Sequence, residues 1–199
     1  MKLKNLIDSI GAEVIGHADM EIGGLAYDSR GVKREDKTLF AALPGERVDG
    51  RGFIKNAVDN GAVAVLAQRA TKGVNAPQII VRDARAALSR ISDRFYGEPS
   101  KGLLMVGVTG TNGKTTTTYL LESIFSSAGF SPGVIGTVNY RYGGHVFPAP
   151  HTTPEAPKLH KILKEMCDSG VTHCVMEVSS HALHQKRAAD VRFNAGIFT

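Results

Sequence analysis

The sequence has few of the features that mark secreted or membrane proteins. It contains no tryptophan and only two cysteines, Cys167 and Cys174, and neither lies in a CxxC pair or a His/Cys cluster at zinc spacing. No apolar run reaches the roughly 18 residues that a membrane helix needs. The basic start at Met1–Lys4 is followed by Asp8 and Glu13, which interrupt any signal-peptide core. We therefore expect a cytoplasmic protein with reduced thiols and no membrane partner.

The charge balance is mildly basic and evenly spread. The 24 Lys and Arg residues exceed the 19 Asp and Glu residues by 5, without a block of like charge or a basic stripe interleaved with aromatic residues. This distribution argues against a nucleic-acid partner. A mildly positive surface instead suits small polyanions such as nucleotides.

The first half of the chain alternates between helical and strand-like patterns. Helices are expected near residues 3–10, 53–62 and 83–95, and buried strands at 38–43, 63–66 and 78–81. Asp83 stands where the N-cap of the third helix would be. Strands separated by helices predict a small α/β domain over residues 1–98, and the pattern breaks at 96–102, the best candidate for a linker.

The pattern restarts after residue 102. Strands are expected at 103–108, 133–136, 172–176 and 195–198, helices at 115–128 and 154–169, and a hairpin over 140–147 that turns at Gly143-Gly144. The apolar strands indicate a parallel sheet, which usually continues beyond four strands. The predicted fold class is α/β, with the N-terminal domain followed by the first part of a P-loop-type ATPase domain over 103–199. Cys174 is expected to be a small core residue on its strand.

The strongest chemical signal is a glycine-rich segment between a predicted strand and helix. It reads Gly107-Val108-Thr109-Gly110-Thr111-Asn112-Gly113-Lys114-Thr115-Thr116. Glycines let the backbone curl so that N–H groups face phosphate oxygens, and the helix start adds a positive dipole. Lys114 would supply a charge for the phosphates and Thr115 a hydroxyl ligand for Mg²⁺. The spacing is a variant with its first glycine at Gly107, and a plain glycine-rich turn is the alternative.

A metal partner is expected at the end of a neighbouring strand. Glu177 ends the strand 172–176 and is followed by Val178-Ser179-Ser180-His181. Carboxyl ends of parallel strands share one edge of the sheet, so Glu177 should face the phosphate loop. One hydroxyl, one carboxylate, phosphate oxygens and water suit Mg²⁺.

Three further polar clusters have a plain structural alternative. The run 27–30 could be only a turn. Thr153 could be only an N-cap, with Pro154 as the first helical residue, and 185–187 could be a solvated face. Ser180-His181 could suggest nucleophilic catalysis, but no glycine elbow surrounds the serine.

Together these segments resemble the Mur ligases of peptidoglycan synthesis. The matching segments are Tyr27-Asp28-Ser29-Arg30, Gly110–Thr116, Thr152-Thr153-Pro154 and Glu177-Val178-Ser179-Ser180-His181-Ala182-Leu183. The resemblance implies a three-domain enzyme with a UDP-binding N-terminal domain, a central ATPase and a C-terminal ligase domain. It implies that residues 1–199 are the front part of that enzyme, without the C-terminal domain and inactive in ligation alone.

The resemblance also implies the reaction. A diamino acid, meso-diaminopimelate or L-lysine, would be joined to UDP-N-acetylmuramoyl-L-alanyl-D-glutamate with ATP and Mg²⁺ through an acyl phosphate. Such a monomeric enzyme would serve cell-wall synthesis, and through it cell shape and division. The choice of diamino acid stays open.

Site roles follow from the resemblance residue by residue. Lys114 and Glu177 would be catalytic, and Thr115 and Glu177 would hold the metal. ATP would contact Gly110, Thr111, Asn112, Gly113, Lys114, Thr115 and Thr116. The UDP-muramoyl peptide would contact Tyr27, Ser29, Glu46, Arg47, Val48, Thr152, Thr153, Ser179, Gln185 and Arg187. His151 departs from the family, which often has Asn there.

Two readings from other classes remain. The chain could be a stand-alone UDP-sugar- or nucleotide-binding module without ligase activity. A regulatory GTPase is the third possibility, but no Asn-Lys-x-Asp segment is present to read guanine.

Overall fold

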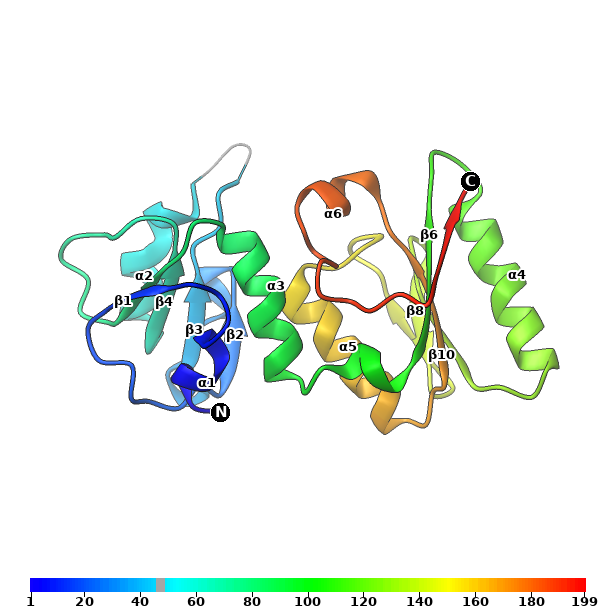
Figure 1. The fold of residues 1–199 in the computed structure, drawn as a ribbon, viewed down its shortest axis with the longest axis horizontal. Coiled ribbons are helices and arrows are strands. Elements are labelled where there is room, and N and C mark those ends of the chain that lie inside the picture. Colours follow the sequence, from blue (N-terminus) through cyan, green and yellow to red (C-terminus); the bar gives the residue numbers. More distant parts are fainter. Residues whose placement is uncertain (46–48) are drawn as a thin grey trace. The chain divides into compact units, whose positions relative to one another are not determined.

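The chain forms two compact units, Met1–Ile91 and Ser92–Thr199. The computed structural model describes residues 1–45 and 49–199 (Figure 1). The division falls within helix α3 (Ala84–Phe95), and the predicted limits at 98 and 103 lie a few residues further along. As predicted, Asp83 caps α3: its Oδ1 accepts from the N–H groups of Arg85 and Ala86, each at 3.0 Å. No helix in the described ranges is long and apolar enough to span a membrane.

The first unit is built on a five-stranded sheet in the order β1-β5-β4-β3-β2. Strands β2 to β5 run parallel, whereas β1 pairs antiparallel with β5. The strands are β1 (Glu13–Ile15), β2 (Gly24–Ala26), β3 (Thr38–Ala41), β4 (Ala64–Ala67) and β5 (Gln78–Ile80), with helices α1 (Leu3–Ile7) and α2 (Ile54–Asp59). The predicted strands match β3, β4 and β5, but β1 and β2 were missed.

The second unit holds a six-stranded sheet in the order β11-β6-β10-β7-β8-β9. Strands β11, β6, β10 and β7 are parallel, and β8 and β9 form an antiparallel hairpin. The strands are β6 (Leu104–Thr109), β7 (Pro132–Ile135), β8 (Asn139–Tyr142), β9 (His145–Pro148), β10 (His173–Glu177) and β11 (Ala195–Phe198). The helices are α4 (Lys114–Ser127), α5 (Ala156–Asp168) and the short α6 (Ser180–His184).

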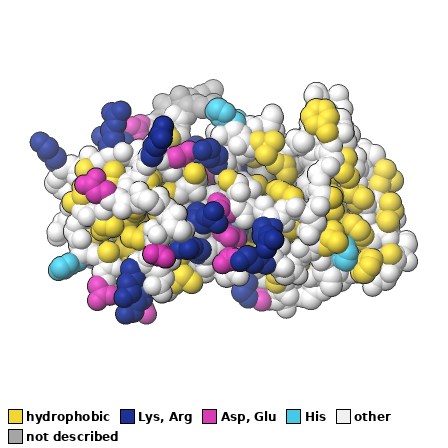
Figure 2. Space-filling view, viewed as in Figure 1, with side chains coloured by type: hydrophobic (Ala, Val, Ile, Leu, Met, Phe, Trp, Pro, Cys, Tyr) yellow, Lys and Arg dark blue, Asp and Glu magenta, His cyan; other side chains and the backbone are white. Residues whose placement is uncertain are grey.

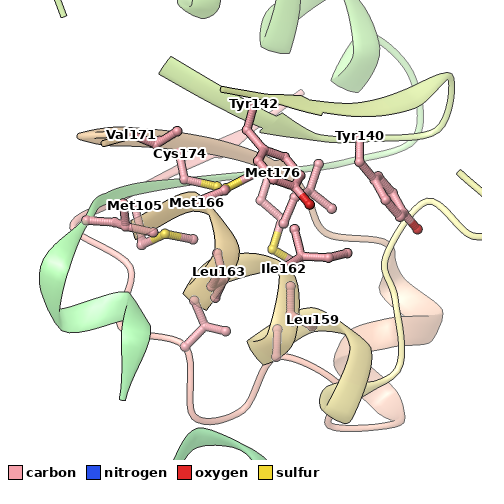
Figure 3. Close-up of a cluster of buried hydrophobic side chains, with 14 of the residues drawn as sticks. Met105, Tyr140, Tyr142, Leu159, Ile162, Leu163, Met166, Val171, Cys174 and Met176 are labelled. Atoms are coloured by element: carbon pink, nitrogen blue, oxygen red, sulfur yellow. The ribbon is translucent and has the colours of Figure 1, made fainter. Parts of the chain in front are cut away.

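The second sheet is covered on both faces. Alternate residues of its central strands supply two clusters: Val106, Val108 and Val175 pack with residues of α4, while Met105, Cys174 and Met176 pack with α5. Figure 3 shows the α5 side, where Leu159, Ile162, Leu163 and Met166 meet the sheet. This alternation explains why the strands read as continuous apolar runs.

Two local predictions for this unit are confirmed. Gly143 and Gly144 have φ of 58° and 77°, the positive values that a two-residue hairpin turn requires. Cys174 is fully buried, and burial raises the pKa of its thiol well above the ordinary range. It is therefore a structural core residue.

The alternative in which Thr153 caps the helix is wrong. Helix α5 begins at Ala156, with Glu155 as an N-cap residue whose side chain makes no capping hydrogen bond, and with Pro157 in the first turn. The Thr153 hydroxyl is used elsewhere, donating to the carbonyl of Glu177 at 2.9 Å. The Thr153 hydroxyl thus makes a long-range hydrogen bond in place of the local capping bond that the sequence pattern suggests.

The two units differ in surface character. Figure 2 shows basic and acidic side chains interspersed on the visible face of the first unit, whereas apolar side chains gather where α4 and β11 lie. Leu120 and Ile124 on α4 are exposed, as is Phe198 on the edge strand β11. These residues contribute little to the two core clusters.

Candidate functional site

The glycine-rich segment forms the connection from β6 to α4, as the sequence predicts. Gly110 and Gly113 have φ of 133° and 80°, in the region that favours glycine, and Gly113 is the N-cap residue of α4. The N–H groups of Thr111, Asn112 and Gly113 have no acceptor within the described part of the chain. Unpaired N–H groups at the N-terminus of a 14-residue helix make an anion-binding site.

Lys114 lies over this loop. Its Nζ donates to the carbonyl oxygens of Gly110 at 2.8 Å and of Thr111 at 3.4 Å. Loop carbonyls are weaker partners for an ammonium group than phosphate oxygens. The side chain is therefore placed where it could exchange these bonds for a bound polyphosphate.

The glycines serve different purposes. A Cβ at Gly110 would collide with the backbone carbonyl of Thr199, whose hydroxyl bonds to the carbonyls of Thr109 and Asn112. Gly107, counted in the sequence as the first glycine of the phosphate motif, lies within β6, as the predicted strand 103–108 implied. A Cβ there would meet the Phe193 ring at 2.9 Å, so packing against this ring requires glycine at position 107.

Glu177 faces the phosphate loop, as predicted from its place at the end of β10. Its Oε1 accepts from the Thr115 hydroxyl and from the N–H of Thr137, each at 3.0 Å. Its Oε2 accepts from the Thr137 hydroxyl, also at 3.0 Å. Only 1% of Glu177 is exposed, and within residues 1–45 and 49–199 it has no ion-pair partner.

This environment suits a divalent cation. A buried carboxylate held only by neutral donors retains an uncompensated charge, which is costly unless a cation joins it. The Thr115 and Glu177 oxygens already converge beside the loop, and both are hard oxygen ligands of the kind that Mg²⁺ prefers. The described residues contain no group of three or more His, Cys, Asp or Glu side chains that could hold a metal. The remaining ligands would have to be phosphate oxygens and water.

The two predicted substrate threonines have different surroundings. The Thr152 hydroxyl is half-buried and lies 3.0 Å from that of Thr137. Thr153 is almost fully buried: besides donating to Glu177, its hydroxyl accepts from the N–H of Ser179 at 3.1 Å. Thr153 therefore braces the end of β10, and Thr152 is the more exposed of the two threonines.

Arg187 is held by internal partners. Its Nε lies 2.9 Å from Glu155 Oε1, and Nε and Nη2 donate to the Gln185 side-chain oxygen at 3.0 and 2.7 Å. Its Nη1 donates to the carbonyl of Thr153 at 2.9 Å. The predicted residues Gln185 and Arg187 thus come together, with the positive charge largely balanced by Glu155. Ser179 caps α6, accepting from the N–H of Ala182 at 3.1 Å.

The predicted UDP-side residues lie in the first unit. Asp28 caps a short 3-10 helix at Ser29–Gly31 and pairs with Arg30 at 2.6 Å, which lowers the pKa of the Asp28 carboxyl. Tyr27 is exposed, whereas Ser29 is 5% exposed. The Ser29 hydroxyl has no hydrogen-bond partner among the residues described. Glu46, Arg47 and Val48, also predicted to contact UDP, lie outside the described residues.

A cavity of about 290 Å³ opens in the same unit near the ends of β3 and β4. It is lined by Ala42, Pro44, Asp49, Arg51, Gln68 and Arg69. Its two arginines outnumber the one carboxylate, Asp49, which lies 4.0 Å from Arg51, so the lining carries one net positive charge. No sequence signal had singled out Gln68 or Arg69.

Thr137 and Gly136 are the site residues that sequence reasoning missed. A Cβ at Gly136 would come within 2.5 Å of Glu177 Oε1, so the carboxylate lies directly over this glycine. The available signal was positional, since Gly136-Thr137 follows a predicted strand. That signal becomes specific only once β7 is known to pair with β10.

Comparison with known proteins gives consistent matches in both units. Residues 21–96 match the Mur ligase family, catalytic domain, and residues 108–199 match the Mur ligase middle domain. The UDP-N-acetylmuramoyl-L-alanyl-D-glutamate–2,6-diaminopimelate ligase of Geobacter sulfurreducens is 47% identical over 198 residues, covering 99% of this chain and 38% of that protein. The chain spans about two fifths of the length of the curated relatives that it matches.

Solved structures agree. The structure of a UDP-N-acetylmuramoyl-L-alanyl-D-glutamate–2,6-diaminopimelate ligase superposes with a TM-score of 0.81 at 27% identity, covering all of this chain and 40% of that one. The MurF ligase of Thermotoga maritima in complex with ADP gives a TM-score of 0.54 at 26% identity, covering 78% of this chain and 32% of that one. With its phosphate loop, its buried carboxylate and these matches across both units, the chain belongs to the Mur ligase family.

Proposed function

We propose that this chain carries the UDP-sugar-binding part and half of the phosphate site of a ligase. That ligase adds a diamino acid, 2,6-diaminopimelate by analogy with the relatives' names, to UDP-N-acetylmuramoyl-L-alanyl-D-glutamate with consumption of ATP. The limits proposed for the two domains are 1–98 and 103–199. Residues 1–199 alone would bind ligands without completing the reaction.

The observation that carries the proposal is the position of Glu177. A buried carboxylate without a cationic partner lies 3.0 Å from the hydroxyl at the start of α4, beside unpaired loop N–H groups. A glycine-rich turn without a ligand would not need that charge. Polyphosphate with a divalent cation satisfies the N–H groups and the carboxylate together.

Each residue then has a defined task. The N–H groups of 111–113 would bind phosphate oxygens of ATP, with Gly110 and Gly113 providing the curl and Thr116 in the first turn of α4. Lys114 would leave the loop carbonyls for the phosphates. Thr115 and Glu177 would hold Mg²⁺, which when bound offsets the repulsion between the anionic substrate and the triphosphate.

The chemistry proceeds by two substitutions. A carboxylate oxygen of the D-glutamyl residue forms a bond to the γ-phosphorus of ATP, and the bond to the ADP oxygen breaks. The amine of the diamino acid then attacks the acyl carbon, an amide bond forms, and phosphate leaves while the amine loses a proton. Lys114 and the loop contribute by neutralising and aligning two groups that would otherwise repel each other.

Each unit would supply its own set of substrate-binding residues. In the first unit, the unpartnered Ser29 hydroxyl, the exposed Tyr27 and residues 46–48 would meet the uridine end. In the second, Thr152, Ser179, Gln185 and Arg187 would meet the muramoyl-peptide end, with Thr153 bracing the end of β10.

A calorimetric titration tests this assignment. UDP-N-acetylmuramoyl-L-alanyl-D-glutamate, UDP and Mg-ATP are each titrated into residues 1–199 and into the protein as its gene encodes it. We expect the UDP ligands to bind both and amide formation only in the latter. Ser29→Ala should weaken UDP binding by about 1 kcal/mol, since one hydrogen bond is lost. Amide formation by residues 1–199, or an unchanged Kd for Ser29→Ala, would contradict the respective assignment.

The second candidate function is a binding module without ligase activity. The observation in its favour is that Lys114 rests on loop carbonyls and Arg187 is balanced by Glu155. That candidate predicts UDP binding without any amide formation in the encoded protein.

A further inference from the structure

Thr137 connects two residues that the proposed function uses separately. Its backbone N–H and its hydroxyl bond to the two oxygens of Glu177, and its hydroxyl also meets the Thr152 hydroxyl, each at 3.0 Å. It stands just after β7, whose register beside β10 pairs Ile135 with Met176. Strand order therefore brings Thr137 to the end of β10.

The donor and the acceptor can be assigned in each of the hydrogen bonds that link Glu177, Thr137 and Thr152. An ionised carboxylate only accepts, so the single Thr137 hydroxyl proton goes to Glu177 Oε2. The Thr152 hydroxyl must then be the donor in its contact with Thr137. Thr152 is left with free lone pairs, so it offers an acceptor to an N–H or O–H group of the substrate.

These hydrogen bonds also fix the orientation of the Glu177 carboxylate. Thr137 binds one oxygen with its backbone and the other with its side chain, which fixes rotation about the last torsion of Glu177. Because Gly136 has no Cβ, no side chain at this position displaces Glu177 Oε1. The oxygen that meets Thr115 is thereby held towards the phosphate loop.

We propose that Thr137 is a positioning residue that sets both the cation-binding orientation of Glu177 and the acceptor orientation of Thr152. The inference rests on the proposed function, because it assumes that Glu177 holds the cation and that Thr152 meets the substrate. It adds a physical link between the two. Loss of one hydroxyl should impair both bindings at once.

Thr137→Val is the informative variant, because it removes the hydroxyl and keeps the backbone N–H and the branched shape. Thr137 is exposed and belongs to neither core cluster of its unit, so the variant should stay folded, with the free energy of unfolding lowered only by the loss of its hydrogen bond to the buried Glu177 carboxylate. Thr137→Ser keeps the hydroxyl and should behave as wild type. Thr117→Val is the matched control, since the Thr117 hydroxyl has no hydrogen bond in the ranges described.

Two binding measurements on the protein as its gene encodes it decide the question. A fluorescent ATP analogue is titrated with MgCl₂, and UDP-N-acetylmuramoyl-L-alanyl-D-glutamate is titrated by calorimetry. We expect Thr137→Val to raise the half-saturating Mg²⁺ concentration about tenfold, the effect of a charge-assisted hydrogen bond, and the substrate Kd about fivefold, the effect of a neutral one. Urea unfolding should show that Thr137→Val is folded under the binding conditions, and Thr137→Ser should restore both constants to their wild-type values.

The outcomes distinguish a failure of the positioning role of Thr137 from a failure of the proposed function. If wild type binds both ligands and Thr137→Val matches Thr117→Val, the positioning role is wrong while the proposed function stands. An increase in only one of the two constants overturns the link between Glu177 and Thr152. If wild type binds neither the nucleotide nor the UDP ligand, the proposed function fails and takes this inference with it.

Discussion

Gly136→Ala should displace the carboxylate on which the proposed phosphate site depends. Gly136 does not have a positive φ, so its backbone accepts alanine, and the obstacle is Glu177 alone. The new Cβ would lie 2.5 Å from Oε1, whereas ordinary contact begins at 3.4 Å. The carboxylate or the strand must therefore move by about 0.9 Å, enough to break bonds of 3.0 Å to Thr115 and Thr137.

The magnitude follows from the two ways of relieving the clash. Displacing the carboxylate weakens two charge-assisted hydrogen bonds, each worth about 1.5–3 kcal/mol, although a bound water can replace part of the loss. Moving the backbone instead is an overpacking change of about 1–3 kcal/mol. We expect the free energy of unfolding to fall by about 1–3 kcal/mol and the half-saturating Mg²⁺ concentration for nucleotide binding to rise at least about tenfold.

The assay pairs urea unfolding with Mg²⁺ titration of a bound fluorescent ATP analogue. Gly196→Ala is the control, because a Cβ there meets nothing within 4 Å and Gly196 has no positive φ. If the Mg²⁺ titrations of Gly136→Ala and Gly196→Ala superimpose, the assignment of Glu177 as the cation ligand is refuted.

Three further predictions concern the second unit. Burial raises the pKa of the Cys174 thiol above its ordinary 9.0, so at alkaline pH the folded thiol stays neutral while the unfolded one ionises. The contribution of this thiol to the free energy of unfolding is therefore complete below pH 9 and falls above it by up to about 1.4 kcal/mol per pH unit. Cys174→Ala should show a shallower alkaline loss of stability in urea unfolding. Tyr142→Phe removes a bond of 2.6 Å to Glu165 and should lower the free energy of unfolding by about 1 kcal/mol, whereas no change would show that this bond contributes nothing. Leu159→Ala should lower it by about 2–5 kcal/mol and Leu120→Ala by less than about 0.5, because Leu159 is fully buried and Leu120 is 60% exposed; equal losses would contradict the assigned core.

Local signals in the sequence predicted most elements of both units. The Asp83 cap and the Gly143-Gly144 turn act over a few residues, so their chemistry is visible without tertiary structure. Strands β1 and β2 were missed because three residues carry too little periodicity to recognise. Their existence depends on neighbouring strands that lie far away in the sequence.

In the proposed phosphate site, too, some features could be predicted from the sequence and others only from the packed structure. Lys114, Thr115 and the glycines at 110 and 113 belong to one continuous segment, so their spacing alone indicated phosphate binding, and Glu177 followed from its place at a strand end. Gly107 is the first glycine of that spacing and lies in the predicted strand, but only the packed structure shows the Phe193 ring against it.

What the sequence determined by itself is the local chemistry: periodicity, caps, turns and the phosphate loop, each encoded within a few consecutive residues. What only the tertiary structure decided is which distant residues share a hydrogen bond. Thr137 reaches Glu177, 40 residues away, because β7 pairs with β10, and Thr153 bonds across the sheet edge instead of capping its helix. Strand order arises from burial of the whole sheet, and no short segment encodes it.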